Sequence, residues 1–317
     1  MPNAHSTVAV ARHAMATRFE IILHGANETS LRAAGEEALN EISRLEDHLS
    51  LYRPTSEIAR LNARAHLEPV RVSPELFRLL QHAQQLHRET GGAFDITIGP
   101  LMRCWGFIGG GGNLPDPVAL AEARAKVGMD LVQLNEGDFT VRFPRPGVML
   151  DLGAIGKGYA IERGAELLRD AGVTSAILHG GTSTVSAIGH PPDAEAWKVA
   201  LELPPTNPAD SPALLAVVPL CDESLSVSAV WGKSFQSGSK TFGHVLDPRT
   251  GEPADRAVLA AVVTRSATES DALSTALLTD GSDAAARIAA LRPATRSLAV
   301  QRKGGAPRIV AHGIVLI

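Results

Sequence analysis

The spacing of apolar residues predicts five helices. Residues 30–51 place apolar side chains at intervals of three and four, the pattern of an amphipathic helix. A second helix begins at Ser73, a favourable N-cap followed by Pro74, and ends before Gly91. Three more helices are predicted over residues 117–129, 159–171 and 268–278.

Short runs rich in β-branched and apolar residues, bounded by turn-forming residues, predict strands between these helices. The predicted strands span residues 14–24, 173–181, 197–204, 214–220, 223–230, 257–264, 297–303 and 306–317. Residues 132–143 predict a hairpin that turns at Glu136-Gly137-Asp138. Because the strands do not alternate one for one with helices, the order favours an α+β fold over a doubly wound parallel sheet.

The length of the chain allows either one large domain or two modest ones. It has 317 residues, of which 44% are hydrophobic, so it can bury a core without disulfide bonds. The glycine run at residues 109–112 is the best candidate for a domain boundary, but it is typical of a surface loop. We therefore expect a single domain over residues 1–317, with residues 1–12 flexible.

Charge and cysteine content narrow the function classes. The 30 basic and 34 acidic residues give a net charge of −4, and no basic block alternates with aromatic residues, which argues against a nucleic-acid-binding protein. The two cysteines, Cys104 and Cys221, have no metal-ligand spacing and are expected to be buried thiols. No signal peptide and no membrane-spanning run is recognised, so a cytoplasmic location is expected.

The segment DLGAIGKGYA, residues 151–160, is the first candidate for chemistry. It fits neither a Walker loop nor a Rossmann turn, because the required serine, threonine and glycine positions are occupied by other residues. Its three glycines could still bring main-chain N–H groups and Lys157 close to a phosphate at a helix start. Asp151 suits such a ligand only where a cation or a hydrogen-bonding group lies between them. The alternative is an ordinary strand-to-helix turn with a solvated lysine.

Asp271 and Thr275 form a second candidate site. Their spacing of four places both oxygens on one helix face, and a hard cation such as Mg²⁺ takes oxygen ligands. The alternative is a capping role, because Thr268 and Asp271 also have the spacing of a capping box.

A third candidate is His244, which precedes the rigid turn at residues 247–251 and could take a proton from a hydroxyl group. Two serine motifs are rejected. Ser237 and Lys240 have the S-x-x-K spacing without its partner motifs, and Ser183 lacks the closing glycine of a nucleophile elbow.

Six segments, taken in order, resemble the ApbE family of FAD:protein FMN transferases. They are MAT at residues 15–17, LEDHLSLYRPTSEIARLN at 45–62, TGGAFDITIGPL at 90–101, DLGAIGKGYA at 151–160, GHVLDPRTGEPA at 243–254 and SDALSTAL at 270–277. Ala16 stands where the family has glycine. Thr182, Ser183, Val227 and Trp231 also depart from the family's usual residues.

The resemblance implies a fold and a reaction. The fold would be a single T-fold-related domain of largely antiparallel sheets with packed helices. Mg²⁺ and FAD would bind, a Ser or Thr hydroxyl of an acceptor protein would attack the FMN phosphorus, and AMP would leave. The acceptor would be an FMN-binding protein or a redox-complex subunit. An FAD pyrophosphatase and a flavin-binding protein without turnover are the alternatives.

The resemblance also implies roles for individual residues. Asp271, Thr275 and the main-chain carbonyl of Ala154 would hold Mg²⁺. The residues implied to contact FAD are Met15, Tyr52, Ala93, Phe94, Asp95, Asp151, Lys157, His244 and Val245. His244 is assigned as the base that takes the proton of the acceptor hydroxyl, with Asp271 or a metal-bound water as the alternatives.

Overall fold

The computed structural model describes residues 6–204, 211–238, 240–301 and 307–317. Its helices are α1 (Glu28–Leu49), α2 (Glu57–Arg64), α3 (Pro74–Glu89), α4 (Gly99–Cys104), α5 (Pro117–Arg124), α6 (Gly156–Asp170), α7 (Ala267–Asp280) and α8 (Asp283–Leu291). Its strands are β1 (Ser6–Ala14), β2 (Thr17–Gly25), β3 (Val70–Arg71), β4 (Gln133–Asn135), β5 (Thr140–Arg142), β6 (Ala176–Gly180), β7 (Thr184–Ile188), β8 (Trp197–Leu203), β9 (Ala213–Leu220), β10 (Ser224–Ala229), β11 (Ser234–Ser237), β12 (Lys240–Gly243), β13 (Leu259–Thr264), β14 (Arg296–Gln301) and β15 (Arg308–His312).

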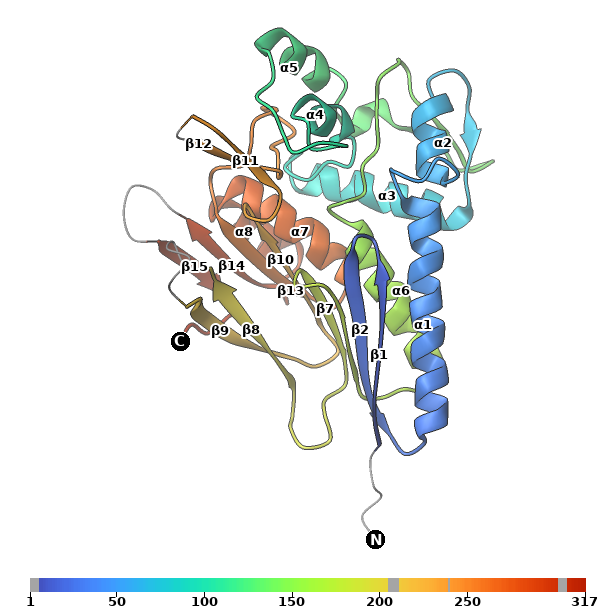
Figure 1. The fold of residues 1–317 in the computed structure, drawn as a ribbon, viewed down its shortest axis with the longest axis vertical. Helices are drawn as coiled ribbons and strands as arrows, with labels where there is room; N and C mark the ends of the chain where they lie inside the picture. The colour runs from blue at the N-terminus through green and yellow to red at the C-terminus, as the bar shows by residue number, and fades with distance from the viewer. Residues whose placement is uncertain (1–5, 205–210, 239, 302–306) are drawn as a thin grey trace.

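An eight-stranded antiparallel sheet organises the molecule, in the order β1-β2-β6-β7-β10-β13-β14-β15. Helices α1, α6 and α7 cover one face (Figure 1). The two-stranded sheet β8–β9 packs its apolar side chains against the other face of the main sheet. This arrangement confirms the α+β class with largely antiparallel sheets.

Strand β13 shows why the sheet needs both covers. All six of its residues are buried. Ala260 and Val262 belong to the core under the helices, whereas Leu259, Ala261 and Val263 belong to the core under β8–β9. An antiparallel strand buried on both faces loses the alternation of polar and apolar residues, which explains the continuous apolar run.

The N-terminal part of the chain is more ordered than the sequence predicts. The expected strand over residues 14–24 is the second half of a hairpin, in which β1 pairs with β2 from Ser6 opposite Gly25 to Ala14 opposite Thr17. The expected flexibility is therefore wrong for residues 6–12, and residues 1–5 lie outside the described residues. The predicted hairpin at residues 132–143 is confirmed by the β4–β5 pairing.

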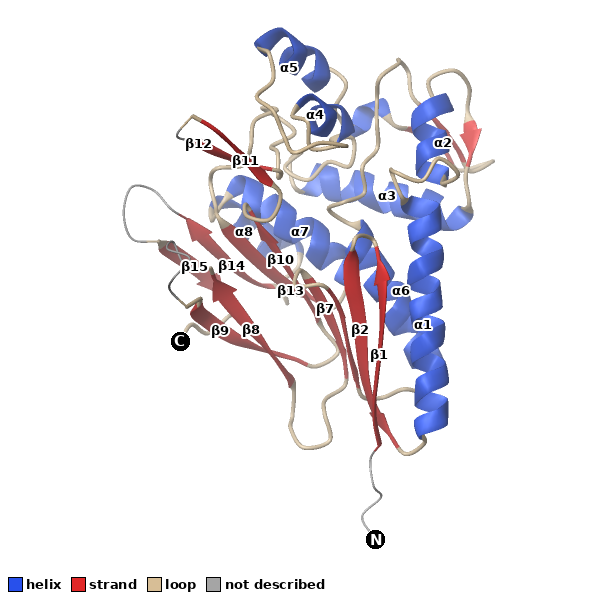
Figure 2. Ribbon diagram, in the orientation of Figure 1, coloured by secondary structure: helices blue, strands red, loops and turns tan. Residues whose placement is uncertain are grey.

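The smaller elements lie together at one end of the main sheet (Figure 2). They include the three-stranded sheet β3-β5-β4, the helices α2 to α5 and the hairpin β11–β12. The predicted helix over residues 117–129 is shorter: α5 ends at Arg124, and Gly128, with φ of 140°, precedes a separate 3-10 turn over Met129–Leu131.

Helices α6 and α7 each provide a carboxylate that accepts hydrogen bonds from the N-terminal end of the other helix. The Gly158 N–H of α6 donates to Asp271 Oδ2 of α7 at 2.9 Å. In return, Glu162 Oε2 of α6 accepts the Thr268 N–H at 2.8 Å and the Ser266 hydroxyl at 2.6 Å. Each carboxylate satisfies a donor at the start of the other helix, where negative charge is also favoured.

The close contact between the two helix starts requires a glycine at position 158. A Cβ atom there would lie 2.2 Å from the Ala267 carbonyl oxygen and 2.7 Å from Asp271 Cβ. Gly158 therefore permits close helix packing, and its N–H group is already used by Asp271. The expectation that this glycine brings its N–H to a ligand is wrong.

The variant Gly158→Ala should reduce the free energy of unfolding by about 3 kcal/mol, the upper end of the usual cost of overpacking, because α7 must move away from α6. Gly156→Ala is the matched control, since its Cβ would meet only Leu152 Cβ at 3.7 Å. Alanine there should change stability by no more than about 1 kcal/mol, in the stabilising direction. Urea unfolding of both variants tests this, and equal stabilities would contradict it.

Candidate functional site

A cavity of about 300 Å³ lies at the start of α6. Three segments form it: the β1–β2 turn, the loop between α1 and α2, and residues 151–157. Its lining includes Met15, Tyr52, Asp151 and Lys157, four of the residues singled out in the sequence. The volume is in the range of small-molecule sites in proteins.

The β1–β2 turn reaches the cavity in a strained conformation. Met15 has φ of 49° and Ala16 has φ of 59°, although neither residue is glycine. These values are those of a type I′ turn, a common two-residue connection between antiparallel strands, and the β1–β2 pairing continues up to Ala14 opposite Thr17. The turn places both residues in the lining of the cavity.

Tyr52 offers an exposed aromatic ring at the same cavity. Its side chain is 65% exposed, yet its main-chain N–H donates to Ser50 Oγ at 3.1 Å. The neighbouring Arg53 pairs with Glu46 at 2.9 Å and also with Asp47. The loop is thus fixed by hydrogen bonds and ion pairs while the ring itself stays free to contact a ligand.

Asp151 and Lys157 are two charged residues that line the cavity. Asp151 Oδ1 accepts the Gly153 N–H at 2.9 Å, and Lys157 Nζ donates to the Gly153 carbonyl at 3.4 Å. Burial raises the pKa of Asp151, against the lowering effects of the Gly153 N–H, Lys157, Lys233 and His244. Ile155 supplies no side-chain cap to α6, and the Gly158 N–H at the helix start is bonded by Asp271 instead.

Asp271 is a buried carboxylate with few partners. It is 5% exposed, burial raises its pKa, and Lys157 and the Gly158 N–H oppose that rise. It does not cap its own helix, because the N-cap of α7 is Ser266, whose hydroxyl accepts the Glu269 N–H. The capping alternative is therefore wrong in its simple form: Asp271 binds the start of α6 instead.

The donors near Asp271 suit a hard cation. The Thr275 hydroxyl lies one turn further along α7 and donates to the Asp271 carbonyl at 3.3 Å. Ala154 precedes α6 and is half-buried. Within the described ranges no group of three or more His, Cys, Asp or Glu side chains could hold a metal. A carboxylate, a hydroxyl and a carbonyl are oxygen donors of the kind that Mg²⁺ takes, usually together with substrate phosphate and water.

His244 follows β12 and is held in one tautomer. Its Nδ1 lies 3.0 Å from the Lys233 carbonyl oxygen. A carbonyl only accepts, so Nδ1 carries the proton and Nε2 keeps a free lone pair. Burial lowers the pKa of His244, and Lys233 and Lys157 lower it further, so the neutral form prevails at pH 7.

The turn after His244 is anchored to the end of α7. Arg249 pairs with Asp247 at 2.7 Å and with Asp280, the last residue of α7, at 2.5 Å. The Trp105 indole N–H donates to the Gly251 carbonyl at 2.7 Å. The rigid turn predicted at residues 247–251 is confirmed, with Gly251 N–H bonded to the Asp247 carbonyl at 2.8 Å.

Five of the nine residues predicted to bind FAD do not line the cavity, namely Ala93, Phe94, Asp95, His244 and Val245. Ala93 and Phe94 are each 1% exposed, and Asp95 is 6% exposed. Asp95 instead accepts the Thr97 N–H at 2.7 Å and pairs with His87 Nδ1 at 3.1 Å. The segment that begins at Ala93 supports the site indirectly, because the Ile96 carbonyl accepts the Asp151 N–H at 2.7 Å.

Two residues, Val245 and Lys233, differ from what the sequence predicts for the site. Val245 packs against the main core, and its side chain is not part of the cavity lining. Lys233, which the sequence did not single out, binds His244 through its carbonyl and acts electrostatically on Asp151. No local pattern marks Lys233, since its role depends on the pairing of β11 with β12.

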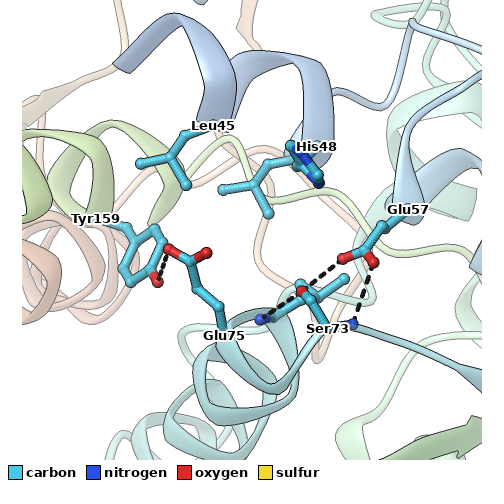
Figure 3. Close-up of a pocket in the computed structure, with 8 residues that line it drawn as sticks. Leu45, His48, Glu57, Ser73, Glu75 and Tyr159 are labelled. Atoms are coloured by element: carbon cyan, nitrogen blue, oxygen red, sulfur yellow. Dashed lines mark hydrogen bonds between the residues drawn. The ribbon is translucent and has the colours of Figure 1, made fainter. Parts of the chain in front are cut away.

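A second cavity, drawn in Figure 3, is too small for a ligand. It holds about 10 Å³, roughly the space of one water molecule. Tyr159 of α6 donates from its hydroxyl to Glu75 Oε1 of α3 at 3.0 Å in this cavity. Its polar groups connect helices rather than face a substrate.

Comparisons with known proteins agree on one family. The profile of the ApbE family matches residues 15–298. An FAD:protein FMN transferase of Haemophilus influenzae is 30% identical over 275 residues, covering 83% of this chain and 78% of that protein. One of Treponema pallidum is 32% identical over 259 residues, covering 78% and 71%.

Solved structures agree with the sequence comparisons. An ApbE protein of Thermotoga maritima superposes with a TM-score of 0.85 at 25% identity, covering 96% of each chain. The flavin transferase ApbE of Vibrio cholerae gives a TM-score of 0.82 at 25% identity, covering 98% of each chain. None of the helices described here has the length and apolar character needed to cross a membrane.

The variant Asp271→Asn should be more stable than the unaltered protein at pH 7 without metal, by about 1–3 kcal/mol, the usual cost of a poorly compensated buried polar group. The amide oxygen still accepts the Gly158 N–H, whereas the buried charge is removed. Because the folded-state pKa of Asp271 is raised, its contribution to stability is present at low pH and is lost as pH rises from about 4 through the folded pKa.

Urea unfolding at several pH values measures this difference. Asp170→Asn, an exposed position at the end of α6, is the matched control and should change the stability at pH 7 by less than about 1 kcal/mol. A less stable Asp271→Asn at pH 7 would show that the carboxylate is already compensated within the protein.

Proposed function

The chain belongs to the ApbE family, and we propose that it transfers FMN from FAD to a Ser or Thr hydroxyl of another protein and releases AMP. The observation that carries this proposal is the convergence of Met15, Tyr52, Asp151 and Lys157 on one cavity at the start of α6. The names of the relatives, FAD:protein FMN transferases, supply the reaction class.

FAD would bind with its aromatic and phosphate parts on different walls of the cavity. Tyr52 offers an exposed ring for stacking. Lys157 would face the pyrophosphate, because its positive charge favours an anion. Asp151 would then contact a hydrogen-bonding part of the nucleotide away from the phosphates.

Asp271, Thr275 and the Ala154 carbonyl are the residues that would hold Mg²⁺. The buried Asp271 carboxylate fits this role, since its one side-chain hydrogen bond in the described part of the chain goes to Gly158. When bound, Mg²⁺ would neutralise charge on the pyrophosphate as the AMP oxygen leaves. Lys157, which acts electrostatically on Asp271, would contribute to the same neutralisation.

His244 would accept the proton of the acceptor hydroxyl. The hydroxyl oxygen forms a bond to the FMN phosphorus, the bond from that phosphorus to the AMP oxygen breaks, and the proton moves to His244 Nε2. The hydrogen bond from Nδ1 to the Lys233 carbonyl keeps Nε2 available for this step. The product is FMN linked to the acceptor by a phosphoester.

Incubation of the protein with FAD, MgCl₂ and a candidate acceptor should give a flavin-fluorescent acceptor band in a denaturing gel. Lys157→Met should reduce the rate by about 10²-fold, the usual loss when one charge-stabilising group is removed. Lys198→Met, at an exposed position of β8, should leave it unchanged. Chromatography that finds free FMN and AMP without labelled acceptor would identify a pyrophosphatase, and intact FAD with every acceptor would identify a binding protein.

The rate should depend on the protonation of His244. Because the pKa of His244 is lowered from 6.5, the neutral base persists at pH 6.5 and above, and kcat/KM should decrease only below that pH. His244→Gln should lose this acid limb together with about 10²–10⁴-fold of the rate. His190→Gln, at an exposed position, is the control. An unchanged pH profile in His244→Gln would assign the base to another group.

A further inference from the structure

A row of hydroxyl groups lies between β10 and α7, buried at Ser226 and half-buried at Ser228. Ser224, Ser226 and Ser228 alternate along β10, so they share one face of the strand. Ser226 and Ser228 contact the helix, where Ser270, Ser274 and Thr275 meet them. These contacts lie directly beside the two α7 residues proposed to hold Mg²⁺.

The two hydrogen-bonded contacts of β10 with α7 involve different partners on the helix. Ser226 Oγ lies 2.8 Å from Ser270 Oγ, and Ser270 in turn donates to the Ala267 carbonyl at 3.0 Å. Ser228 Oγ instead reaches both Ser274 Oγ, at 2.8 Å, and Thr275 Oγ1, at 3.2 Å. Only the second contact touches a proposed metal ligand.

The hydrogen bonds of Thr275 determine where its lone pairs point. Its Oγ1 has one proton and two lone pairs. If Ser228 donates to it, the Thr275 proton goes to the Asp271 carbonyl, 3.3 Å away, and one lone pair remains. If Thr275 donates to Ser228, both lone pairs remain. In either case the proton is directed into the protein, as binding of a cation through oxygen requires.

We infer that Ser228 is a positioning residue that orients the Thr275 hydroxyl for a divalent cation. Without Ser228 the hydroxyl keeps only the longer, 3.3 Å contact with the Asp271 carbonyl, so its orientation rests on one weak bond and its proton is held less firmly away from the cation. When Ser274 donates to the Asp271 carbonyl, at 2.9 Å, Ser228 donates to Ser274 and accepts from Thr275, and both lone pairs of Thr275 remain available. This inference rests on the metal site of the proposed function.

The test is the dissociation constant of Mg²⁺, measured by calorimetry on the protein saturated with FAD and without acceptor. Ser228→Ala should weaken Mg²⁺ binding about 10- to 100-fold, the usual effect of losing a group that orients a metal ligand. Ser226→Ala is the matched control, because it removes a hydroxyl from the same face of the same strand. It should change the constant less than about twofold, since Ser226 bonds Ser270 and Thr184, neither of which is a proposed metal ligand.

Two further variants separate orientation from packing. Ser228→Thr keeps the hydroxyl and should restore Mg²⁺ binding, whereas Ser228→Cys keeps the volume and should show the same loss as alanine, which also serves if the alanine variant does not fold. Mg²⁺ binding by Ser228→Ala or Ser228→Cys equal to that of the unaltered protein would overturn the inference alone. An unaltered protein that binds no Mg²⁺ would overturn the proposed metal site, and this inference with it.

Discussion

The reciprocal hydrogen bonds between carboxylates and N-terminal donors of α6 and α7 are the interaction on which the site depends. Asp271 accepts the Gly158 N–H, and Glu162 accepts the donors at the start of α7. These bonds fix the two helix starts relative to each other. They also place the Asp271 carboxylate next to the segment that carries Ala154 and Lys157. Any change that separates the helices would therefore affect the fold and the site together.

Burial of charge without a full set of partners is the second constraint. Asp151 and Asp271 both have a pKa raised by burial, and the nearby cation common to both is Lys157. Such an arrangement is costly in the free protein, but it is suited to a ligand that brings a cation and a phosphate. His244, whose pKa is lowered by burial and by Lys233 and Lys157, is a third titratable group near Lys157 with a shifted pKa.

Much of the local structure could be predicted from the sequence. The spacing of apolar residues in 30–51 and the cap at Ser73 gave α1 and α3, because these signals act within one or two turns of chain. Strand β1 was missed, since its sequence STVAVARHA mixes apolar and polar residues without a strong turn signal at Met15-Ala16. The hairpin β11–β12 was also missed. Its Phe235 and Phe242 pack on Trp105, which is far away in the sequence, so no local pattern shows this contact.

By itself, the sequence determined the class of fold, the order of six family segments and the residue types available for chemistry, because these depend on composition and short spacing. The tertiary structure decided what each residue does. Phe94 is buried, and Asp95 pairs with His87. Gly158, which was expected to face a ligand, packs against α7 instead. The tertiary structure also joined Ser228 to Thr275. The reason is physical: burial and hydrogen-bond partners are set by contacts between segments far apart in the chain, such as the 113 residues that separate Gly158 from Asp271.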